Sequence, residues 1–358
     1  MKVHVQNLKA GDILKQDVFS LSSRPIVSKE TKLTQEHINV LKAFMIKEVD
    51  IQPGASTEPN KKSEEDKTKR AEFVPQESDF HSLYTKAVAQ YKKQFSNWQA
   101  GSPVDLLSIR KEIVPLIDVA VDRPKTILSL HYFSTVPDYI YHHAISVGLI
   151  SSFLAKKLSL SKGDITQLGL AGLLMDCGMS KIQPSILSKK APLSQQESEE
   201  IKQHPIIGYK MLKGTPGIKE SVLLSVLQHH EREDGSGYPL GTKGNQLSLY
   251  SRVVAIADVF HAMTSERVYR GKQSPFKVLE QMTMDQFGKF DQKILDILVN
   301  ELSHFSVGTK VELTDNQIGE IVFIDPRSQT RPMIKVDNTG EIIPLKQRND
   351  LYIESILS

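Results

Sequence analysis

The chain has 358 residues, 39% of them hydrophobic, and a formal net charge of +3, which is ordinary for a soluble protein of two or three domains. The small, dispersed charge argues against a basic groove for a nucleic-acid polymer, and no apolar run approaches the roughly 20 residues of a membrane helix. The single cysteine, Cys177, excludes a disulfide framework and is typical of a reducing compartment. Because the segment MKVHVQNLKAGD lacks the apolar region of a secretory signal, we predict a cytoplasmic protein.

Residues 1–52 are predicted to form a small N-terminal α/β module. Val3 to Val5 alternates as a strand does, and Thr34 to Phe44 has the apolar spacing of a helix. The following residues, 53–72, include the stretch PGASTEPNKKSEEDKTKR, which is highly charged and lacks a large apolar side chain. Such a segment cannot bury enough apolar surface to order itself, so we predict a disordered linker.

Residues 73–102 are predicted to form a connecting amphipathic helix, which Ser78 or Asp79 can cap and Gly101 ends. Large apolar side chains recur on one face of this helix: Phe80, Tyr84, Val88, Tyr91 and Phe95. A stripe of this kind is most often part of a core. The alternative is a helix that pairs two copies of the chain as a homodimer.

Residues 103–305 are helical by pattern. Leu168 to Leu174 is an apolar run, and Arg252 to Met263 is apolar on nearly all sides, which predicts a buried helix. Ser194 with Glu197 has the spacing of a capping box, in which each residue bonds to the main chain of the other. The helix that begins there is expected to end near His204 and Pro205.

Residues 306–358 change to a period of two, which predicts a small β-barrel-like C-terminal domain. The strands we expect are Lys310–Leu313, Ile318–Ile324, Met333–Val336 and Glu341–Leu345. The predicted fold class is therefore mainly α, an all-helical core flanked by a small α/β module and a small β domain.

Histidines and aspartates at wide spacing form the candidate functional site. Two histidines open the motif HHEREDGSGYP, and other ligand-type residues lie on helices that must pack together. Taken singly, each is most simply a core or capping residue, since a buried carboxylate is usually hydrogen-bonded or paired. Together they offer the mixed nitrogen and carboxylate donors that suit iron, manganese or zinc. The set is His143, Asp176, His204, His229, His230 and Asp258.

The motif HHEREDGSGYP closely resembles the signature of HD-GYP domains, a branch of the HD metal-dependent phosphohydrolases. The resemblance extends over about Asp138 to Glu301 and includes HHAISVG, LLMDCGMSKI, KQHPIIGYKML and RVVAIADVFHAMTSERVYR. It implies an all-helical domain with a centre of two or three metal ions, and hydrolysis of cyclic di-GMP to the linear dinucleotide or GMP. The N-terminal segment also resembles, weakly, a small module that often precedes such domains.

Position by position, the resemblance assigns a role to each candidate. His143 matches the first ligand histidine, Asp176 the bridging aspartate and Asp258 the late ligand aspartate. The second metal takes three histidines, His204, His229 and His230. Arg267 and Arg270 fall where family members place cations against the substrate phosphates, and Tyr238 borders the substrate pocket. The candidate catalytic residues are Asp176 and Tyr238.

The sequence departs from the family pattern in the HD motif. Met175 replaces the ligand histidine, and Met179 replaces the lysine that faces the reacting phosphate. Tyr139 stands where a third-metal glutamate occurs, and His261 replaces a usual aspartate. We therefore predict one competent metal site, with the three histidines of the second metal, and one weakened site. Cys177, more simply a buried thiol, and His261 are the candidate replacement ligands.

Three functions follow from these observations. The first is a phosphodiesterase that uses one or two divalent ions, iron or manganese, to hydrolyse cyclic di-GMP, with the lost residues lowering its activity. The second is a catalytically impaired sensor of cyclic di-GMP, or a scaffold that binds a protein partner through the loop that ends in Gly237, Tyr238 and Pro239, the GYP loop. The third is hydrolysis of another phosphoester or cyclic dinucleotide.

Overall fold

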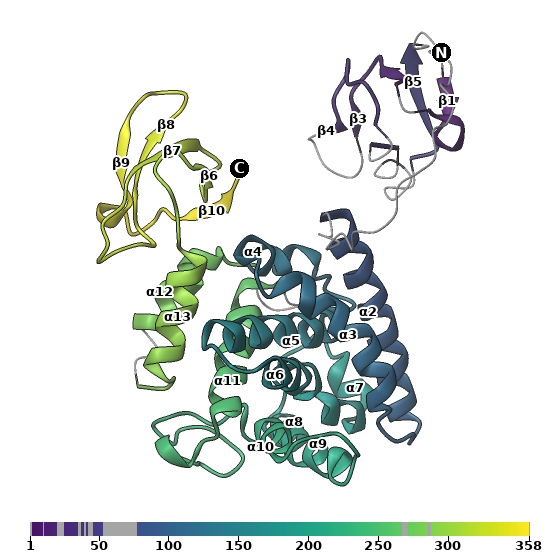
Figure 1. The fold of residues 1–358 in the computed structure, drawn as a ribbon, viewed down its shortest axis with the longest axis vertical. Helices are drawn as coiled ribbons and strands as arrows, with labels where there is room; N and C mark the ends of the chain where they lie inside the picture. The colour runs from purple at the N-terminus through teal and green to yellow at the C-terminus, as the bar shows by residue number, and fades with distance from the viewer. Residues whose placement is uncertain are drawn as a thin grey trace, which may run out of the picture. The chain divides into compact units, whose positions relative to one another are not determined.

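The computed structural model describes residues 2–9, 11–19, 25–34, 37–38, 41, 46–52, 77–266, 271–284 and 288–357. The chain divides into two units, Met1–Glu72 and Phe73–Ser358, which are described separately (Figure 1). The predicted linker at 53–72 lies outside the described residues, as do Arg267 and Arg270.

The N-terminal unit is built from short antiparallel strands. Its strands are β1 (Lys2–His4), β2 (Ile13–Leu14), β3 (Val18–Phe19), β4 (Pro25–Val27) and β5 (Glu48–Gln52). One sheet has the order β1-β5-β2 and a second pairs β3 with β4. Val5, Leu14 and Leu41 are among the side chains of its small core. The helix predicted at Thr34 to Phe44 lies largely outside the described residues.

Helices make up most of the second unit, so the predicted mainly α class is confirmed. The helices are α2 (Glu77–Gln99), α3 (Leu106–Ala120), α4 (Pro124–Phe133), α5 (Tyr139–Lys157), α6 (Lys162–Leu174), α7 (Pro184–Leu187), α8 (Gln195–Ile201), α9 (His204–Leu212), α10 (Glu220–Gln228), α11 (Leu249–Thr264), α12 (Pro275–Met284) and α13 (Gln292–Leu302). Short 3-10 turns are η2 (Cys177–Lys181) and η3 (Gly244–Gln246). Of the described helices, none is long and apolar enough to cross a membrane.

Helix α2 packs its apolar stripe into the core of its own chain. Tyr84, Tyr91 and Phe95 are buried in the same hydrophobic cluster as α5 and α6. The Tyr84 hydroxyl lies 3.0 Å from Ser146 Oγ of α5, and the Lys181 ammonium of η2 donates to the main-chain oxygen of Trp98. The stripe is therefore core, and α2 contacts two elements that carry candidate ligands.

Local signals in the sequence set several helix boundaries. The predicted capping box is present, since Glu197 N donates to Ser194 Oγ and Ser194 N donates to the Glu197 carboxylate. The helix that it starts, α8, ends at Ile201, and α9 begins at His204 with Pro205 in its first turn. Proline is favoured there because the first turn needs no amide donor. The predicted buried helix is α11, which is buried along most of its length.

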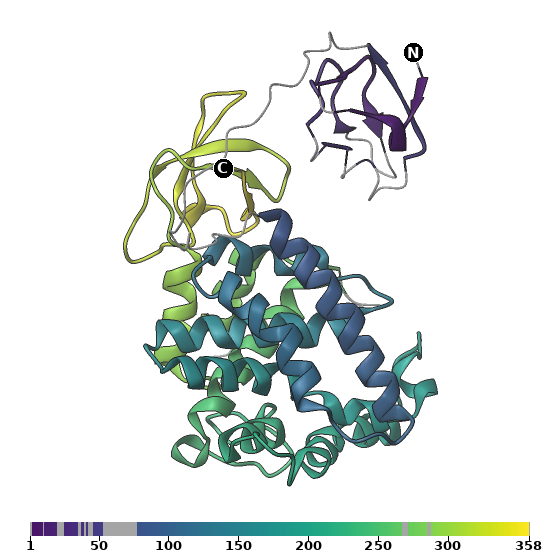
Figure 2. The same cartoon turned by 45° about the vertical axis from the view of Figure 1, so that its right-hand side comes forward.

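The C-terminal residues form one antiparallel sheet, drawn in yellow-green to yellow in Figure 2. Its order is β10-β6-β7-β8-β9, with bounds β6 (Lys310–Leu313), β7 (Ile318–Phe323), β8 (Met333–Val336), β9 (Ile342–Pro344) and β10 (Ile353–Ile356). The four predicted strands are present within one or two residues. The sequence interpretation missed β10, whose polar glutamate and serine weaken the period-two signal.

Candidate metal centre

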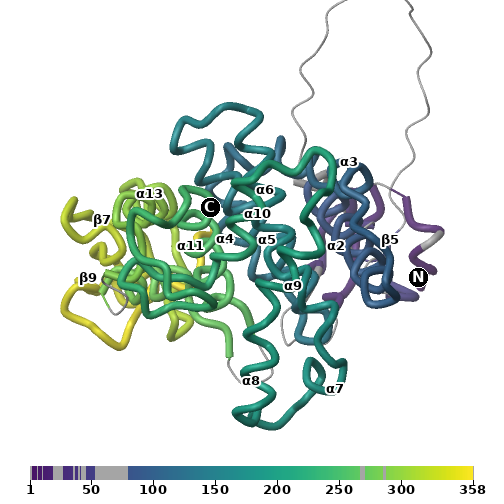
Figure 3. Tube along the Cα trace, turned by 90° about the horizontal axis from the view of Figure 1, so that it is seen from below, coloured from purple at the N-terminus to yellow at the C-terminus, as the bar shows by residue number. Residues whose placement is uncertain are grey.

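Five segments of the helical core supply the candidate ligands. His143 lies in α5, Asp176 directly precedes η2, and His204 begins α9. His229 and His230 follow the end of α10, and Asp258 lies in α11. Helix α10 packs against both α9 and α11 (Figure 3). Residues far apart in the chain therefore meet at one end of the core.

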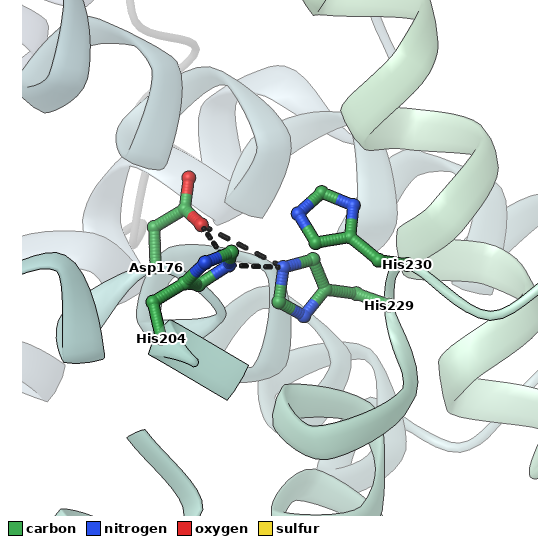
Figure 4. A group of neighbouring side chains, drawn as sticks. All are labelled: Asp176, His204, His229 and His230. Atoms are coloured by element: carbon green, nitrogen blue, oxygen red, sulfur yellow. Dashed lines mark hydrogen bonds and ion pairs between the residues drawn. The ribbon is translucent and has the colours of Figure 1, made fainter. Parts of the chain in front are cut away.

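Asp176, His204, His229 and His230 form a compact group (Figure 4). One ligand atom from each lies within 4.8 Å of the others, and among the described residues this is the group of at least three ligand-type side chains that meets that criterion. Nε2 of His204 lies 3.1 Å from Nε2 of His229 and 3.1 Å from Asp176 Oδ1. Asp176 Oδ1 is 3.6 Å from Nε2 of His229. These three atoms face one another.

Main-chain carbonyls fix the orientation of two of these rings. Nδ1 of His204 donates to the carbonyl of Ile201 at 2.7 Å, and Nδ1 of His229 donates to that of Val226 at 2.8 Å. A carbonyl only accepts, so in each neutral ring the proton is on Nδ1 and the lone pair is on Nε2. Two lone pairs and a carboxylate oxygen that converge in this way are stabilised by a cation between them.

The spacing also fits one metal ion. Two ligand atoms about 2.1 Å from an ion, at 90–110° to each other, lie roughly 3.0–3.4 Å apart. Burial alone would raise the pKa of Asp176, but its contacts with His204 and His229 outweigh burial and hold that pKa well below its usual range. Burial and the neighbouring His229 lower the pKa of His230, so its ring is neutral. An ionised carboxylate and neutral imidazoles are the forms that bind divalent metals.

The other half of the centre has fewer donors. His143 Nε2 lies 3.0 Å from Asp258 Oδ1 and 3.8 Å from Asp176 Oδ2. His230 Nδ1 is 3.6 Å from Asp258 Oδ2. Each aspartate therefore spans both halves of the centre. Burial alone would raise the pKa of Asp258, but the hydrogen bond from His143 and the neighbouring His230 ring lower it.

The replaced residues of the HD motif contribute no donor to this half. Met175 is completely buried in the hydrophobic core, and Met179 packs against the same core. Burial raises the pKa of the Cys177 thiol, which favours the uncharged form. Cys177 is outside the group of converging ligand atoms, and its sulfur lies near Gly208 of α9.

His261, the other candidate replacement ligand, lies behind His143. Its Nδ1 is 2.9 Å from Nδ1 of His143, the ring nitrogen on the far side from the two aspartates. The Tyr139 ring stacks on His143 with centroids 5.1 Å apart and planes 19° apart. His261 therefore contacts a candidate ligand through the ring nitrogen of that ligand that does not face the carboxylates.

The turn that carries Asp176 requires a glycine. A Cβ at Gly178 would lie 2.1 Å from the carbonyl oxygen of His204 and 2.6 Å from the amide nitrogen of Gly208. Only glycine lets η2 approach α9 so closely. This contact brings Asp176 next to His204, which explains on packing grounds why the glycine remains in an otherwise altered motif.

The GYP loop folds back on the same centre through Glu231, a residue that the sequence interpretation did not single out. Its carboxylate is buried and accepts hydrogen bonds from Leu240 N at 2.7 Å and Thr242 N at 3.0 Å. A Cβ at Gly237 would lie 2.4 Å from the carbonyl oxygen of His230, so the loop runs directly against the histidines. The available signal was an acidic residue directly after a histidine pair.

Of the three residues predicted to contact substrate, Tyr238 is the one that the structure describes. Its ring stacks on His230 with centroids 4.7 Å apart and planes 29° apart. Burial and the negative charges of Asp176 and Asp258 raise its pKa, so the phenol is neutral. It lies beside the metal-ligand group, while its predicted contact with substrate stays a prediction.

The HD domain family matches residues 126–294. The chain is 31% identical over 255 residues to the cyclic di-GMP phosphodiesterase PA4108 of Pseudomonas aeruginosa, covering 71% of this chain and 61% of that protein. It is 36% identical over 152 residues to the cyclic di-GMP phosphodiesterase response regulator RpfG of Xanthomonas campestris, covering 42% and 40%. It is 34% identical over 169 residues to the 3'3'-cGAMP-specific phosphodiesterase 1 of Vibrio cholerae, covering 47% and 39%.

Among solved structures, Bd1817, described as an HDG"Y"P protein from Bdellovibrio bacteriovorus, has a similar fold. The TM-score is 0.54 at 14% identity, and the match covers 85% of this chain and 99% of that one. The chain spans 61% of the first curated relative above and smaller shares of the other two.

Proposed function

Because this chain belongs to the HD-GYP domain family, we propose that it is a metal-dependent phosphodiesterase that hydrolyses cyclic di-GMP to the linear dinucleotide or GMP. The observation that carries the proposal is the convergence of Nε2 of His204, Nε2 of His229 and Oδ1 of Asp176, with His230 beside them. Curated relatives at 28–36% identity are named for this activity.

Within the proposed site, one group of residues would bind the metal ion and another would contact the substrate. Asp176, His204, His229 and His230 would hold a divalent ion, iron or manganese, since these metals take mixed nitrogen and carboxylate donors. When bound, such an ion lowers the pKa of a coordinated water and neutralises phosphate oxygens. Tyr238 presents an aromatic face beside His230, where a nucleotide base or ribose can pack. Arg267 and Arg270 are proposed to bind the substrate phosphates, a role that rests on the sequence alone.

A second candidate function, a sensor or scaffold without turnover, is favoured by Met175 and Met179. Both side chains pack in or against the core and neither carries a charge or a hard donor. Removing one group that stabilises charge in the transition state typically costs about two to three orders of magnitude in rate. Such a protein would keep the nucleotide pocket, or bind a partner through the GYP loop. For either function we propose the cytoplasm as its compartment.

The experiment that separates the two functions is hydrolysis of cyclic di-GMP by the purified full chain with added Mn²⁺ or Fe²⁺. We expect linear dinucleotide to form, and His230→Ala to lower the rate by about two orders of magnitude or more, because a ligand and its positioning of the ion are lost. His304→Ala, at an exposed histidine after α13, is the matched control and should retain the rate. Tight nucleotide binding with no product would instead establish the sensor.

A further inference from the structure

We propose that His261 is a positioning residue that sets the tautomer of His143 and so leaves the first metal position without its histidine ligand, giving one tightly bound ion per chain. The inference rests on the metal centre of the proposed function and goes further, because it concerns how many ions that centre takes. In each half of the site, a histidine directs Nε2 at the other ligand atoms and has Nδ1 as its second ring nitrogen. The two halves differ in what this second nitrogen contacts.

In the intact half, the second nitrogens contact groups that only accept. Nδ1 of His204 and Nδ1 of His229 both donate to main-chain carbonyls, at 2.7 and 2.8 Å. The proton of each neutral ring must therefore be on Nδ1, and Nε2 must present its lone pair to the shared point. Without a cation or an added proton, those lone pairs face each other at 3.1 Å. This half thus depends on a cation.

In the altered half, the second nitrogen contacts a group that is able to donate. Nδ1 of His143 lies 2.9 Å from Nδ1 of His261, and Nε2 of His261 lies 3.2 Å from Ser265 Oγ. All three side chains are buried. A hydrogen bond between two neutral imidazoles needs exactly one proton between the nitrogens, so the pair has two alternatives.

The first alternative places the proton on His261. Ser265 Oγ then donates to Nε2 of His261, Nδ1 of His261 donates to Nδ1 of His143, and Nε2 of His143 donates to Asp258 Oδ1 at 3.0 Å. Every contact in this series joins one donor to one acceptor. The His143 lone pair is directed at His261, and the nitrogen that would bind an ion carries a proton.

The second alternative places the proton on Nδ1 of His143. Nε2 of His143 then directs its lone pair at Asp258 Oδ1 across 3.0 Å, a contact that needs a cation. The completely buried Met175 offers no imidazole to help hold that cation, and its thioether is a poor ligand for hard or borderline ions. The first alternative satisfies the same groups with no ion and is therefore favoured.

An aspartate at position 261 would remove this choice. A carboxylate only accepts, so it would place the proton of His143 on Nδ1 and turn the Nε2 lone pair toward Asp176 and Asp258. Groups that orient a ligand in this way typically change metal affinity by about 10–100-fold. Position 261 is thus expected to control the first metal position without touching the ion.

The tautomer of His143 is measured directly on the wild-type chain. The full chain, labelled with ¹⁵N-histidine and loaded with one equivalent of diamagnetic Zn²⁺, gives two-bond ¹H–¹⁵N spectra that distinguish protonated from unprotonated ring nitrogens. The His143 signals are identified by their loss in His143→Gln. We expect the proton on Nε2 of His143. A proton on Nδ1, with Nε2 unprotonated, would overturn the inference, and this measurement requires no variant at position 261 to fold.

The number of ions is measured by titrating metal-free chain with Mn²⁺ and following free Mn²⁺ by electron paramagnetic resonance. We expect one tight site in the wild type, and in His261→Asp a second site whose affinity is at least about 10-fold higher than the weak second binding of the wild type. Ala262→Asp is the matched control, because it adds the same charge about 100° around α11. A gain of the same size in Ala262→Asp would attribute the effect to charge and contradict the tautomer.

The counts also separate this inference from the proposed function. Two tight ions in the wild type would overturn the inference and leave the phosphodiesterase proposal standing. No bound ion would overturn both. One ion in the wild type with no gain in a folded His261→Asp would show that position 261 does not control the first metal position, and would overturn the inference.

Discussion

Glu231 connects the GYP loop to the metal-ligand histidines. It directly follows His230, and its buried carboxylate accepts the amide protons of Leu240 and Thr242 on the far side of the loop. Tyr238 N donates to the carbonyl of His230 at 3.2 Å within the same loop. A single side chain therefore closes the loop over the histidine pair and helps to place the Tyr238 ring on His230.

Replacing Glu231 should loosen the loop before it affects the ligands. Glu231→Gln keeps the volume but turns one acceptor oxygen into a donor, which leaves an amide of the loop unpaired. We expect a loss of about 1–3 kcal/mol in the free energy of unfolding, measured by urea denaturation, together with weaker nucleotide binding. Glu199→Gln, at an exposed residue of α8, should leave the unfolding free energy and nucleotide binding unchanged. Equal effects of both variants would refute this role for Glu231.

At the scale of elements, the centre depends on how closely η2 approaches α9. The contact joins Asp176, just before η2, to His204, the first residue of α9. Helix α2 also packs on η2, through the Lys181 bond to the Trp98 carbonyl, and on α5 through Tyr84. The ligands are thus positioned by main-chain packing as well as by their own hydrogen bonds.

Gly178→Ala tests that packing. The added Cβ would meet main-chain atoms of α9 at 2.1 and 2.6 Å, which cannot rotate away. We expect a destabilisation of about 3 kcal/mol, at the upper end of the range for overpacking, and a lower metal affinity because η2 must move away from His204. Gly163→Ala in α6 is the control, since the nearest atom to its Cβ is Ser161 Oγ at 3.7 Å. It should be neutral or stabilise the helix by up to about 1 kcal/mol.

At the scale of the whole second unit, Arg331 connects the C-terminal β domain to the helical core through hydrogen bonds to α12. Its guanidinium donates to both oxygens of Glu280 on α12, at 2.5 and 2.6 Å, and to the carbonyl of Leu351 at 2.8 Å. It also lies 4.0 Å above the Tyr352 ring. The Arg331 side chain is only 9% exposed, so this contact acts as part of the interior and not as a surface ion pair.

Removing Arg331 should separate the sheet from α12. Arg331→Ala leaves the Glu280 carboxylate half-buried without its partner, which typically costs about 3 kcal/mol. The expected result is faster native-state hydrogen exchange in β7, β8 and α12, with α5 and α6 unchanged. Arg348→Ala removes an arginine of the segment between β9 and β10 that pairs with Asp350 in solvent, and should leave exchange unchanged. Uniform exchange throughout the unit in Arg331→Ala would contradict a local role.

The sequence by itself determined the helical class, the family and the identity of the candidate ligands. These are carried by local patterns: the periodicity of residues 103–305, the capping box at Ser194, the four strands after Ser306, and the long motif around His229. Local signals failed where polar residues masked the period, as in β10, and in residues whose role depends on a distant partner, such as Glu231.

Only the tertiary structure decided what the replaced residues do. His143 and His261 lie 118 positions apart in the chain, yet their rings are in hydrogen-bond contact. The sequence offered His261 as a substitute ligand, and the fold places its Nδ1 against Nδ1 of His143. The physical reason is that a histidine's role depends on which of its two nitrogens carries the proton. That is set by the neighbouring acceptor or donor, which only the packing of α5 against α11 supplies.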